Sequence, residues 1–366
     1  MKRFVWLTLH LCALAALAWT PAALAEDARE AAARDGANLQ RPVWSPDGTK
    51  LSFEANFHEK KTIELHVGDP WSKSFTRIVP VSRGSSAITS GFTKTRNLNQ
   101  VVHEISWAPR SAGTYVYSAS GSASDFDLYL NSGSVLAQGA GSDGGPSFSP
   151  SGQQLAFTSA RSGEGDLYLI DFGAASQAPG RLTRQSNSSE VYASWSPDGE
   201  QIAYVAHGKR GDNLWLTNKD GQAKQLTFWK GSQTHPVFSP DGKHIAFYAN
   251  HQDEDRFDLY VMAVGSSQVP TLLIRSVVLN ARGPVWSPDS KRLLFAHNDD
   301  ERFDPLAQVQ ITSPGKLQRL SFGTVGHGDL DLIERADGSW WLAYIAQGRT
   351  GDKERTFKRL FVVKVR

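Results

Sequence analysis

The chain has 366 residues, with 39 Lys and Arg against 37 Asp and Glu. A single hydrophobic core stops growing at roughly 250–300 residues, so a chain of this length divides into domains or is built from repeats. The near-neutral charge argues against a nucleic-acid binder, whose sequence-independent affinity comes from many Lys and Arg contacts to phosphate. Its 32 Gly and 17 Pro residues describe a turn-rich globular protein rather than a disordered or collagen-like one.

The first 25 residues have the order of a secretory signal peptide. Lys2 and Arg3 precede an apolar run over residues 4–19, and small residues lead up to Ala25. The run is shorter than the ~20 residues of a membrane span, which argues against an uncleaved anchor. We therefore expect cleavage between Ala25 and Glu26, no transmembrane segment afterwards, and a periplasmic or secreted protein.

A short phrase that joins an aromatic residue to a proline turn recurs along the rest of the chain. The six plain copies are Trp44–Gly48, Trp107–Pro109, Phe148–Gly152, Trp195–Gly199, Phe238–Gly242 and Trp286–Asp289. Their prolines are 41 to 63 residues apart, close to the ~40–50 residues of a propeller blade. An aromatic residue that recurs once per repeat is expected in the core between blades rather than in a stacking site.

Each copy predicts a strand, a tight turn and a second strand. Proline fixes φ at about −65° for a turn, and glycine accepts the left-handed conformation that closes a hairpin. Alternating aromatic and branched residues predict second strands at 51–53, 115–117, 155–157, 202–204, 245–247 and 293–295. Third strands are expected at 63–67, 128–130, 167–169, 214–216 and 259–261, and short fourth strands at 181–183, 225–227 and 319–321.

A seventh, degenerate repeat follows the six plain ones. Ala336–Gly338 forms a turn of the same kind, and strand-like residues follow at 341–344 and 360–365. The fold class is therefore all-β, a β-propeller of four-stranded antiparallel blades over residues 41–366, with seven blades and six as the alternative. Residues 26–40 form an N-terminal segment that we expect to supply the closing strand of the last blade, which would remove exposed sheet edges.

The repeat resembles a known family of propellers. The phrase W-S-P-D-G, followed by I-A-F or I-A-Y and later by D-L-Y-L, is similar to the WD-repeat-like units of the periplasmic TolB-like family. Similar units occur in the propellers of prolyl-oligopeptidase-type peptidases. The resemblance covers residues 41–366 and implies the fold more firmly than the function. TolB-like proteins carry a small α/β domain ahead of the propeller, whereas only 15 residues separate the expected cleavage site from the first repeat, so we expect a propeller alone.

The chain contains no motif that indicates catalysis. No serine lies in the Gly-x-Ser-x-Gly elbow of a hydrolase, and neither a phosphate loop nor His-Glu-x-x-His is present. The single cysteine, Cys12, lies in the leader, so no thiol nucleophile or thiolate metal site is expected. The acidic clusters match no calcium loop. We therefore expect no catalytic residues, no cofactor and no metal.

The candidate binding residues lie just before the first strand of each repeat, where a propeller chain enters the inner strand beside the central channel. These positions hold Arg41, Glu104, Gly145, Tyr192, His235 and Gly283. A mixed ring in which Arg41, Glu104, Tyr192 and His235 are the side chains suits recognition of a peptide or a partner protein. A hydrated channel without a ligand is the alternative.

A second candidate surface comes from the loops that follow the second strands. It contains His207, Lys209, Arg210, His251 and His297. A Ser-, Gly- and Thr-rich insertion at 80–100 is long for a compact repeat and is either a binding loop or disorder.

Taken together, the sequence predicts a non-enzymatic, protein-binding scaffold of the cell envelope. The resemblance implies a role in a transport or energy-transduction assembly, with envelope or periplasmic proteins as partners and a peptide segment in the channel as one form of contact. The alternatives are a stand-alone or accessory hydrolase related to the peptidase propellers, and a binder of glycans or small ligands.

Overall fold

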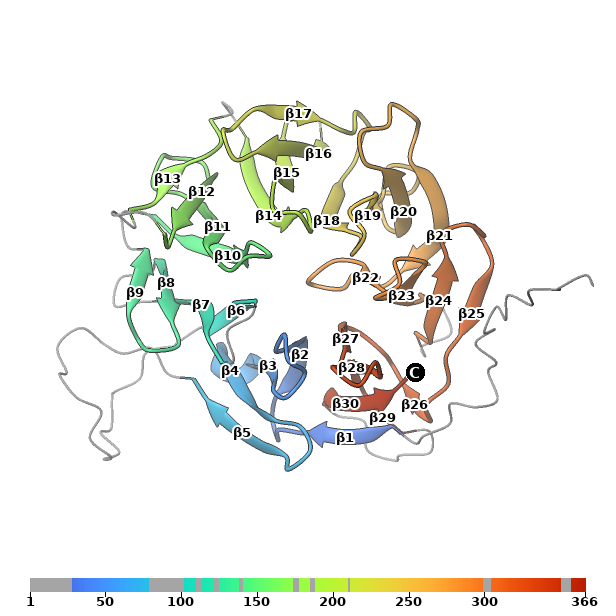
Figure 1. Cartoon of the computed structure of the whole chain (residues 1–366). Helices are drawn as coiled ribbons and strands as arrows, with labels where there is room; N and C mark the ends of the chain where they lie inside the picture. Colours follow the sequence, from blue (N-terminus) through green and yellow to red (C-terminus); the bar gives the residue numbers. More distant parts are fainter. Residues whose placement is uncertain are drawn as a thin grey trace, which may run out of the picture.

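Seven four-stranded antiparallel sheets surround a central axis as the blades of a β-propeller (Figure 1). The computed structural model describes residues 28–78, 102–109, 113–120, 125–137, 141–173, 178–184, 188–209, 211–298, 304–349 and 357–366. The expected signal peptide at 1–25, the insertion at 80–100 and Arg210 lie outside these residues. The prediction of an all-β propeller with seven blades is confirmed.

In every blade the four strands lie side by side and follow one another from the axis to the rim (Figure 1). Blade 1 consists of β2 (Asn38–Trp44), β3 (Leu51–Phe57), β4 (Thr62–Asp69) and β5 (Ser74–Arg77). Blade 2 consists of β6 (Val102–Trp107), β7 (Tyr115–Ser120), β8 (Phe126–Leu130) and β9 (Val135–Ala137). Blade 3 consists of β10 (Asp143–Phe148), β11 (Gln154–Ser159), β12 (Asp166–Asp171) and β13 (Gly180–Arg181).

The next three blades repeat this order. Blade 4 consists of β14 (Ser189–Trp195), β15 (Gln201–Gly208), β16 (Gly211–Asn218) and β17 (Ala223–Gln225). Blade 5 consists of β18 (Gln233–Phe238), β19 (His244–Ala249), β20 (Phe257–Ala263) and β21 (Thr271–Val277). Blade 6 consists of β22 (Val285–Trp286), β23 (Arg292–Ala296), β24 (Leu306–Gln310) and β25 (Leu317–Arg319).

Blade 7 combines both ends of the described chain. It consists of β27 (Leu330–Glu334), β28 (Trp340–Ala346), β30 (Arg359–Lys364) and, at the rim, β1 (Arg29–Ala32). Strand β1 pairs antiparallel with β30, with Glu30 opposite Phe361. A separate short pair joins β26 (Thr324–Val325) to β29 (Gly348–Arg349). Because the rim strand of blade 7 comes from the start of the propeller, the ring is closed by backbone hydrogen bonds rather than by side-chain packing alone.

The recurring aromatic residue of each repeat is buried between neighbouring blades. The six anchors Trp44, Trp107, Phe148, Trp195, Phe238 and Trp286 are 4% to 9% exposed. Two of them also donate a hydrogen bond to the preceding blade. Trp195 Nε1 donates to the carbonyl oxygen of Ser147 at 3.0 Å, and Trp286 Nε1 donates to that of Val237 at 3.1 Å. These aromatic rings therefore hold blade to blade and leave recognition to other residues.

The turn after each inner strand is closed by its own side chains. In blade 4, Ser196 Oγ donates to Asp198 Oδ1 at 2.5 Å, and the backbone N–H of Gln201 donates to Ser196 Oγ at 2.9 Å. Gly199 adopts φ = 74°, which a side chain would strain. Hydrogen bonds from the Ser196 hydroxyl and the Glu200 N–H hold the pKa of Asp198 below its usual value. The repeated phrase thus encodes a rigid hairpin that brings each second strand back toward the channel mouth.

Three of the fourth strands end two residues earlier in the chain than the sequence predicted. The strands β13, β17 and β25 end at Arg181, Gln225 and Arg319. In two blades a threonine hydroxyl accepts the next hydrogen bond from the neighbouring strand in place of a backbone carbonyl. Thr183 Oγ1 accepts from Leu167 N, and Thr227 Oγ1 accepts from Leu214 N, both at 2.9 Å. The side chain replaces a backbone acceptor there, so the strand ends earlier than its β-branched residue suggests.

Helical structure within the described residues is limited to the short 3-10 helix η2 (His58–Lys60). Over the ranges given above, no helix has the length and hydrophobicity needed to cross a membrane.

Candidate functional site

The inner strands of five blades contain a β-bulge at the predicted mouth residue. The register of pairing shifts around this residue in β2, β6, β10, β14 and β18. The φ angles there are positive, at 49° for Arg41, 57° for Glu104, 59° for Gly145, 58° for Tyr192 and 51° for His235. A bulge re-aims a side chain out of the ladder, and a non-glycine residue in this region is strained.

This placement corrects the sequence analysis in one respect. Five of the six positions lie within the first strand and not before it, while Gly283, with φ = 92°, precedes β22. The extra residue of each bulge leaves the pairing ladder without ending the strand. The mouth residues are therefore held by pairing on both sides, which makes them more rigid than loop residues.

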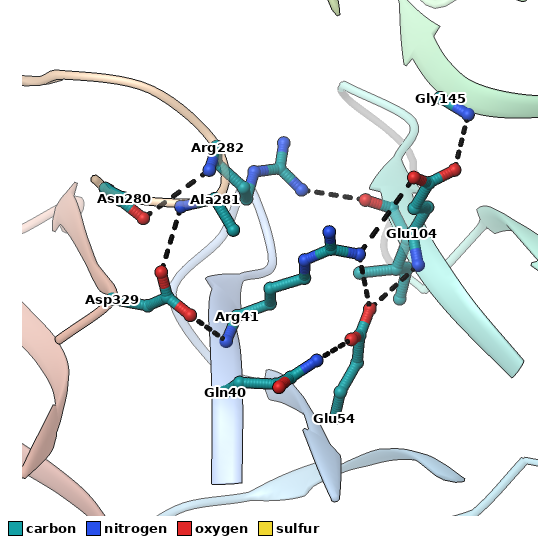
Figure 2. A network of polar contacts seen from close by, with 10 residues as sticks. Gln40, Arg41, Glu54, Glu104, Gly145, Asn280, Ala281, Arg282 and Asp329 are labelled. Carbon is teal, nitrogen blue, oxygen red and sulfur yellow. Dashed lines mark hydrogen bonds and ion pairs between the residues drawn. The ribbon is translucent and has the colours of Figure 1, made fainter. Parts of the chain in front are cut away.

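Carboxylates from the neighbouring blade cap the N–H groups of the bulges (Figure 2). Glu54 Oε1 of blade 1 accepts a hydrogen bond from the backbone N of Glu104 at 2.9 Å. Glu104 Oε2 in turn accepts from the backbone N of Gly145 at 2.6 Å. Asp329 of blade 7 accepts from the backbone N of Arg41 and from that of Ala281, both at 2.9 Å. Charge-assisted hydrogen bonds of this kind offset the strain of the left-handed residues.

The Arg41 side chain points into the mouth between two of these carboxylates. Its Nη1 lies 3.4 Å from Glu54 Oε1 and 4.0 Å from Glu104 Oε1, and the side chain is 30% exposed. Burial alone would lower the pKa of Arg41, but the carboxylates of Glu54, Glu104 and Asp329 outweigh burial and raise it. Arg41 is therefore a fixed cation whose charge is largely balanced by the protein itself.

Arg282 crosses the channel from blade 6 to blade 2. Its Nη1 donates to the carbonyl oxygen of Ile105 at 2.7 Å, while much of the side chain stays exposed to the channel. Removal of the guanidinium from bulk water between the blades lowers the pKa of Arg282, and the Asp331 carboxylate opposes this effect. Asp331 accepts from the backbone N of Trp44 at 2.8 Å, and burial raises the pKa of Asp331 to about 6 although Arg282 and the Trp44 N–H oppose the rise.

Aromatic groups form the opposite side of the mouth. The rings of Tyr192 and His235 are 3.9 Å apart between centroids, and Tyr192 is 42% exposed. Thr234 Oγ1 is 2.9 Å from His235 Nδ1. Burial, with the nearby Arg41 cation adding to it, lowers the pKa of His235 to about 4. The imidazole is therefore neutral at pH 7 and acts as a flat partner for the tyrosine ring.

These groups line a cavity of about 140 Å³ at the hub. Its lining comes from five blades and comprises Arg41, Val43, Glu54, Glu104, Ile105, Gly145, Pro146, Ser147, Tyr192, Ala193, Ala281 and Arg282. Three of the four predicted mouth side chains are in this lining: Arg41, Glu104 and Tyr192. The fourth, His235, stacks on the ring of Tyr192. The cavity offers charged groups on one side and an aromatic ring on the other, which suits the side chains of a peptide.

Sequence reasoning missed four charged hub residues: Glu54, Arg282, Asp329 and Asp331. For Glu54 the chain did contain a signal. It follows the aromatic residue of the second strand, where the other repeats have Ser118, Thr158, Val205, Tyr248, Ala296 and Ile345. One charge at a position that is otherwise neutral, and only 2% exposed, indicates a partner across the blade boundary.

The histidines of the second candidate surface each contact a different partner. His207 Nδ1 lies 2.8 Å from Asp212 Oδ1 in blade 4, and Lys209 is exposed beside it. His251 stacks on Trp229 with 4.1 Å between ring centroids. His297, in blade 6, bridges to Val277 of blade 5. Arg210 lies outside the described residues.

Within the described ranges no group of three or more His, Cys, Asp and Glu side chains is placed to hold a metal ion. The carboxylates of the hub are occupied by backbone N–H groups and by arginine, as the contacts above describe.

Comparisons with known proteins agree on the type of propeller. The Tol-Pal system protein TolB of Francisella tularensis subsp. mediasiatica (strain FSC147) is 30% identical over 177 residues, which cover 47% of this chain and 39% of that protein. The corresponding protein of F. tularensis subsp. tularensis (strain FSC 198) has the same identity over 38% of its length. The match thus spans about two fifths of the length of these relatives.

Solved structures are similar to the chain in fold. The crystal structure of TolB from Acinetobacter baumannii has a TM-score of 0.50 at 17% identity and covers 77% of this chain and 65% of that one. The oligogalacturonate lyase of Vibrio parahaemolyticus has a TM-score of 0.59 at 11% identity and covers 92% of this chain and 93% of that one. A model of the family described as the TolB beta propeller domain matches residues 99–321, more than half of the chain. The chain therefore belongs to the TolB β-propeller family.

Proposed function

We propose that this chain is a non-catalytic, exported propeller that binds other proteins through its channel mouth, in a transport or energy-transduction assembly of the cell envelope. Three observations support the proposal: the signal-like leader, the membership of the TolB propeller family, and curated relatives that are named as parts of a Tol-Pal system. The location in the periplasm and the partner proteins belong to the proposal.

The observation that carries the proposal is the geometry of Tyr192. Its backbone is held at φ = 58°, its ring rests on the neutral ring of His235, and 42% of the residue is exposed at the mouth. Strained backbone persists where the surroundings fix it, and such sites are often functional. A rigid, exposed tyrosine beside a fixed arginine is the kind of anchor that dominates protein interfaces, because little side-chain entropy is lost on binding.

The hub also limits what can enter. Arg282 spans the channel to Ile105, and both residues line the cavity of about 140 Å³. We propose that the mouth accepts a turn or chain end of a peptide segment, with one aromatic or apolar side chain against Tyr192 and a polar group toward Arg41. A folded domain would rest on the surrounding loops.

Crosslinking in cell envelopes tests the proposal directly. Wild-type protein is expected to capture envelope proteins, and Tyr192→Gly is expected to lose them while unfolding at a similar denaturant concentration, because glycine relieves the positive φ. Phe228→Ser is the matched control, since Phe228 is 76% exposed and lies outside the cavity lining. Capture that does not exceed background in wild type, or that is equal in wild type and Tyr192→Gly, contradicts the proposal.

An enzyme would give a different result in vitro. Turnover of peptides, lactones or sugars by purified protein, abolished by Glu104→Ala or His235→Ala, would replace the scaffold by a hydrolase. A ligand-induced rise in melting temperature with a glycan or small molecule would point instead to a small-ligand binder.

A further inference from the structure

One buried position recurs in three successive blades with different chemistry. It lies on the inner strand two residues before the bulge and holds Asp143 in β10, Glu190 in β14 and Gln233 in β18. Each of the three residues is 0% exposed. A fully buried polar side chain requires partners for its hydrogen bonds and its charge, so the three sites can be compared directly.

Two of the three sites leave no unbalanced charge, although Asp143 Oδ1 has no hydrogen-bond partner among the described residues. The Asp143 carboxylate lies 2.7 Å from the Arg161 guanidinium. In the neutral amide of Gln233, Oε1 accepts from Thr227 Oγ1 and Nε2 donates to the carbonyl oxygen of Lys230, both at 3.2 Å. The first site balances a charge with a charge, and the second contains no charge.

Glu190 has the hydrogen bonds but no cation bound directly to its carboxylate. Ser188 Oγ donates to its Oε1 at 2.5 Å, and Thr183 Oγ1 donates to its Oε2 at 3.1 Å. None of the ion pairs between described residues includes Glu190. The acidic residue Asp166 lies beside it, because both chain neighbours of Asp166 are bonded to this site. The backbone N of Glu190 donates to the carbonyl oxygen of Gly165, and the hydroxyl of Thr183 that binds Glu190 also accepts from the backbone N of Leu167.

The charges around Glu190 come from both blades at this junction. Asp166, on β12, is bound by Arg181 Nη2 of β13 at 2.9 Å and by the hydroxyl of Ser162. Elsewhere in the two blades, the charged groups Asp143 and Arg161 of blade 3 pair with each other, and His207 Nδ1 lies 2.8 Å from Asp212 Oδ1 in blade 4. In blade 4 the residue that corresponds to Asp166 is the amide Asn213, because Leu167 and Leu214, which follow these two residues, make the same hydrogen bond to a threonine hydroxyl.

We propose that Glu190 and Asp166 form a proton-binding site between blades 3 and 4, in which Glu190 is held as a neutral acid whose O–H donates to the Asp166 carboxylate. Arg181 balances the remaining charge. Burial raises the pKa of Glu190 to about 7, and the Asp166 charge adds to the rise while the Ser188 and Thr183 hydroxyls oppose it. Two carboxyl groups that share a site and cannot both ionise behave in this way.

The site lies at a structural seam. The backbone N of Glu190 donates to the carbonyl oxygen of Gly165, and its own carbonyl oxygen accepts from Thr158 Oγ1, both at 2.9 Å. Both contacts join blade 4 to blade 3, and β14 also carries Tyr192 two residues further on. Loss of the proton places two negative charges at this seam and weakens it. The inference does not depend on whether the mouth binds a partner.

The direction of the pH effect follows from linkage. The pKa of Glu190 is raised in the folded state above its ordinary value of 4.5, so the folded protein binds a proton that the unfolded chain does not. Its contribution to stability is complete below the ordinary value and is lost as the pH rises toward 7. This one proton lowers the folding equilibrium constant up to tenfold per pH unit across that window.

Urea unfolding of the full chain from pH 5 to 8 tests the site. Glu190→Gln is expected to lack the one-proton decline in stability that Glu190 contributes, so that it gains stability relative to wild type as the pH rises. Glu200→Gln is the matched control on the same blade, because Glu200 is exposed and pairs with Lys219, and it should keep the wild-type slope. An unchanged slope in Glu190→Gln overturns the inference.

A second variant keeps the test decisive if Glu190→Gln does not fold. Asp166→Asn removes the acidic neighbour and leaves the Arg181 cation near Glu190, which should move the pH-dependent region to lower pH. A profile that stays at the wild-type position in Asp166→Asn overturns the proposed sharing of a proton.

Discussion

The guanidinium of Arg282 donates a 2.7 Å hydrogen bond to the carbonyl oxygen of Ile105, across the axis of the propeller. The two residues are 177 positions apart and belong to blades 6 and 2. Side chains within one blade cannot brace the ring across its centre. This contact does so, and it places a cation in the lining of the mouth cavity.

Replacing Arg282 should loosen the hub in a pH-dependent way. Arg282→Met loses a hydrogen bond from a charged donor and is expected to lower the free energy of unfolding by about 1–3 kcal/mol. It also removes the cation that opposes the raised pKa of Asp331, so that pKa rises further above its ordinary value of 3.8. A raised acid pKa contributes stability that is lost with increasing pH, so the deficit should be larger at pH 7 than at pH 4.

Chemical denaturation at several pH values measures this effect. Arg275→Met serves as control, because the Arg275 side chain is 64% exposed and pairs with Asp258 at the rim strand of blade 5. Equal losses in the two variants would show that the contact across the axis adds no stability.

His235 should make the fold sensitive to acid. Its pKa is lowered to about 4 from 6.5, so between these values the unfolded chain binds a proton that the folded state excludes. The stability from this depressed pKa is present above about pH 6.5 and is lost as the pH falls through 4. His235→Asn tolerates the positive φ and removes the titrating ring, so its acid-induced loss should be smaller than that of wild type.

The experiment separates His235 from Glu190, whose effect has the opposite sign. Unfolding between pH 4 and 7 is compared in Glu190→Gln and in the double variant with His235→Asn, so that Glu190 contributes to neither profile. Identical acid losses in the two proteins would mean that His235 titrates in the folded state as it does in water.

Arg335 should hold blade 7 to blade 1. Its guanidinium carbon lies 4.6 Å from the ring centre of Trp71, 5.2 Å from that of Trp341 and 5.8 Å from that of Trp44. Its Nη2 also donates to the carbonyl oxygen of Gly48 at 2.6 Å. We expect Arg335→Met to lower the free energy of unfolding by about 1–3 kcal/mol through the loss of these cation–π contacts and the hydrogen bond.

Arg335→Lys separates the contribution of the positive charge from that of the planar guanidinium, since lysine keeps the charge and loses the planar group that stacks on the tryptophans. It should be intermediate between wild type and Arg335→Met in urea unfolding followed by tryptophan fluorescence. If both variants match wild type, the closure depends on the β1–β30 pairing alone.

The repeats made the fold predictable, whereas the hub was only partly so. Proline turns and alternating strands are local patterns, and the six plain copies with the degenerate seventh repeat together predicted the blade count and the strand order. The placement of Arg41, Glu104, Tyr192 and His235 at the channel also followed from the sequence, because their distance from each aromatic anchor is constant, while their role in binding stays a prediction. Glu54 and Asp329 were not found, since their partners are backbone N–H groups of other blades, and no single repeat contains both members of such a contact.

The fourth strands illustrate the same limit at short range. A strand of two or three residues ends where a competing acceptor appears, and Thr183 and Thr227 supply one from a side chain. Periodicity alone does not distinguish a β-branched residue that continues a strand from one whose hydroxyl ends it.

The amide site in blade 5 offers a way to create a proton-binding site as well as remove one. Gln233→Glu would place a carboxyl between Thr227 Oγ1 and the carbonyl oxygen of Lys230, which Gln233 Nε2 now contacts at 3.2 Å. Only a protonated carboxyl can donate to that carbonyl, so the pKa of the new acid should rise well above 4.5. In a Glu190→Gln background, the double variant should regain a decline in stability of up to about 1.4 kcal/mol per pH unit between pH 5 and 7. A flat profile would mean that water reaches the buried position, and it would also contradict the proton-binding site at Glu190, because both sites are built on the same kind of threonine and leucine contacts.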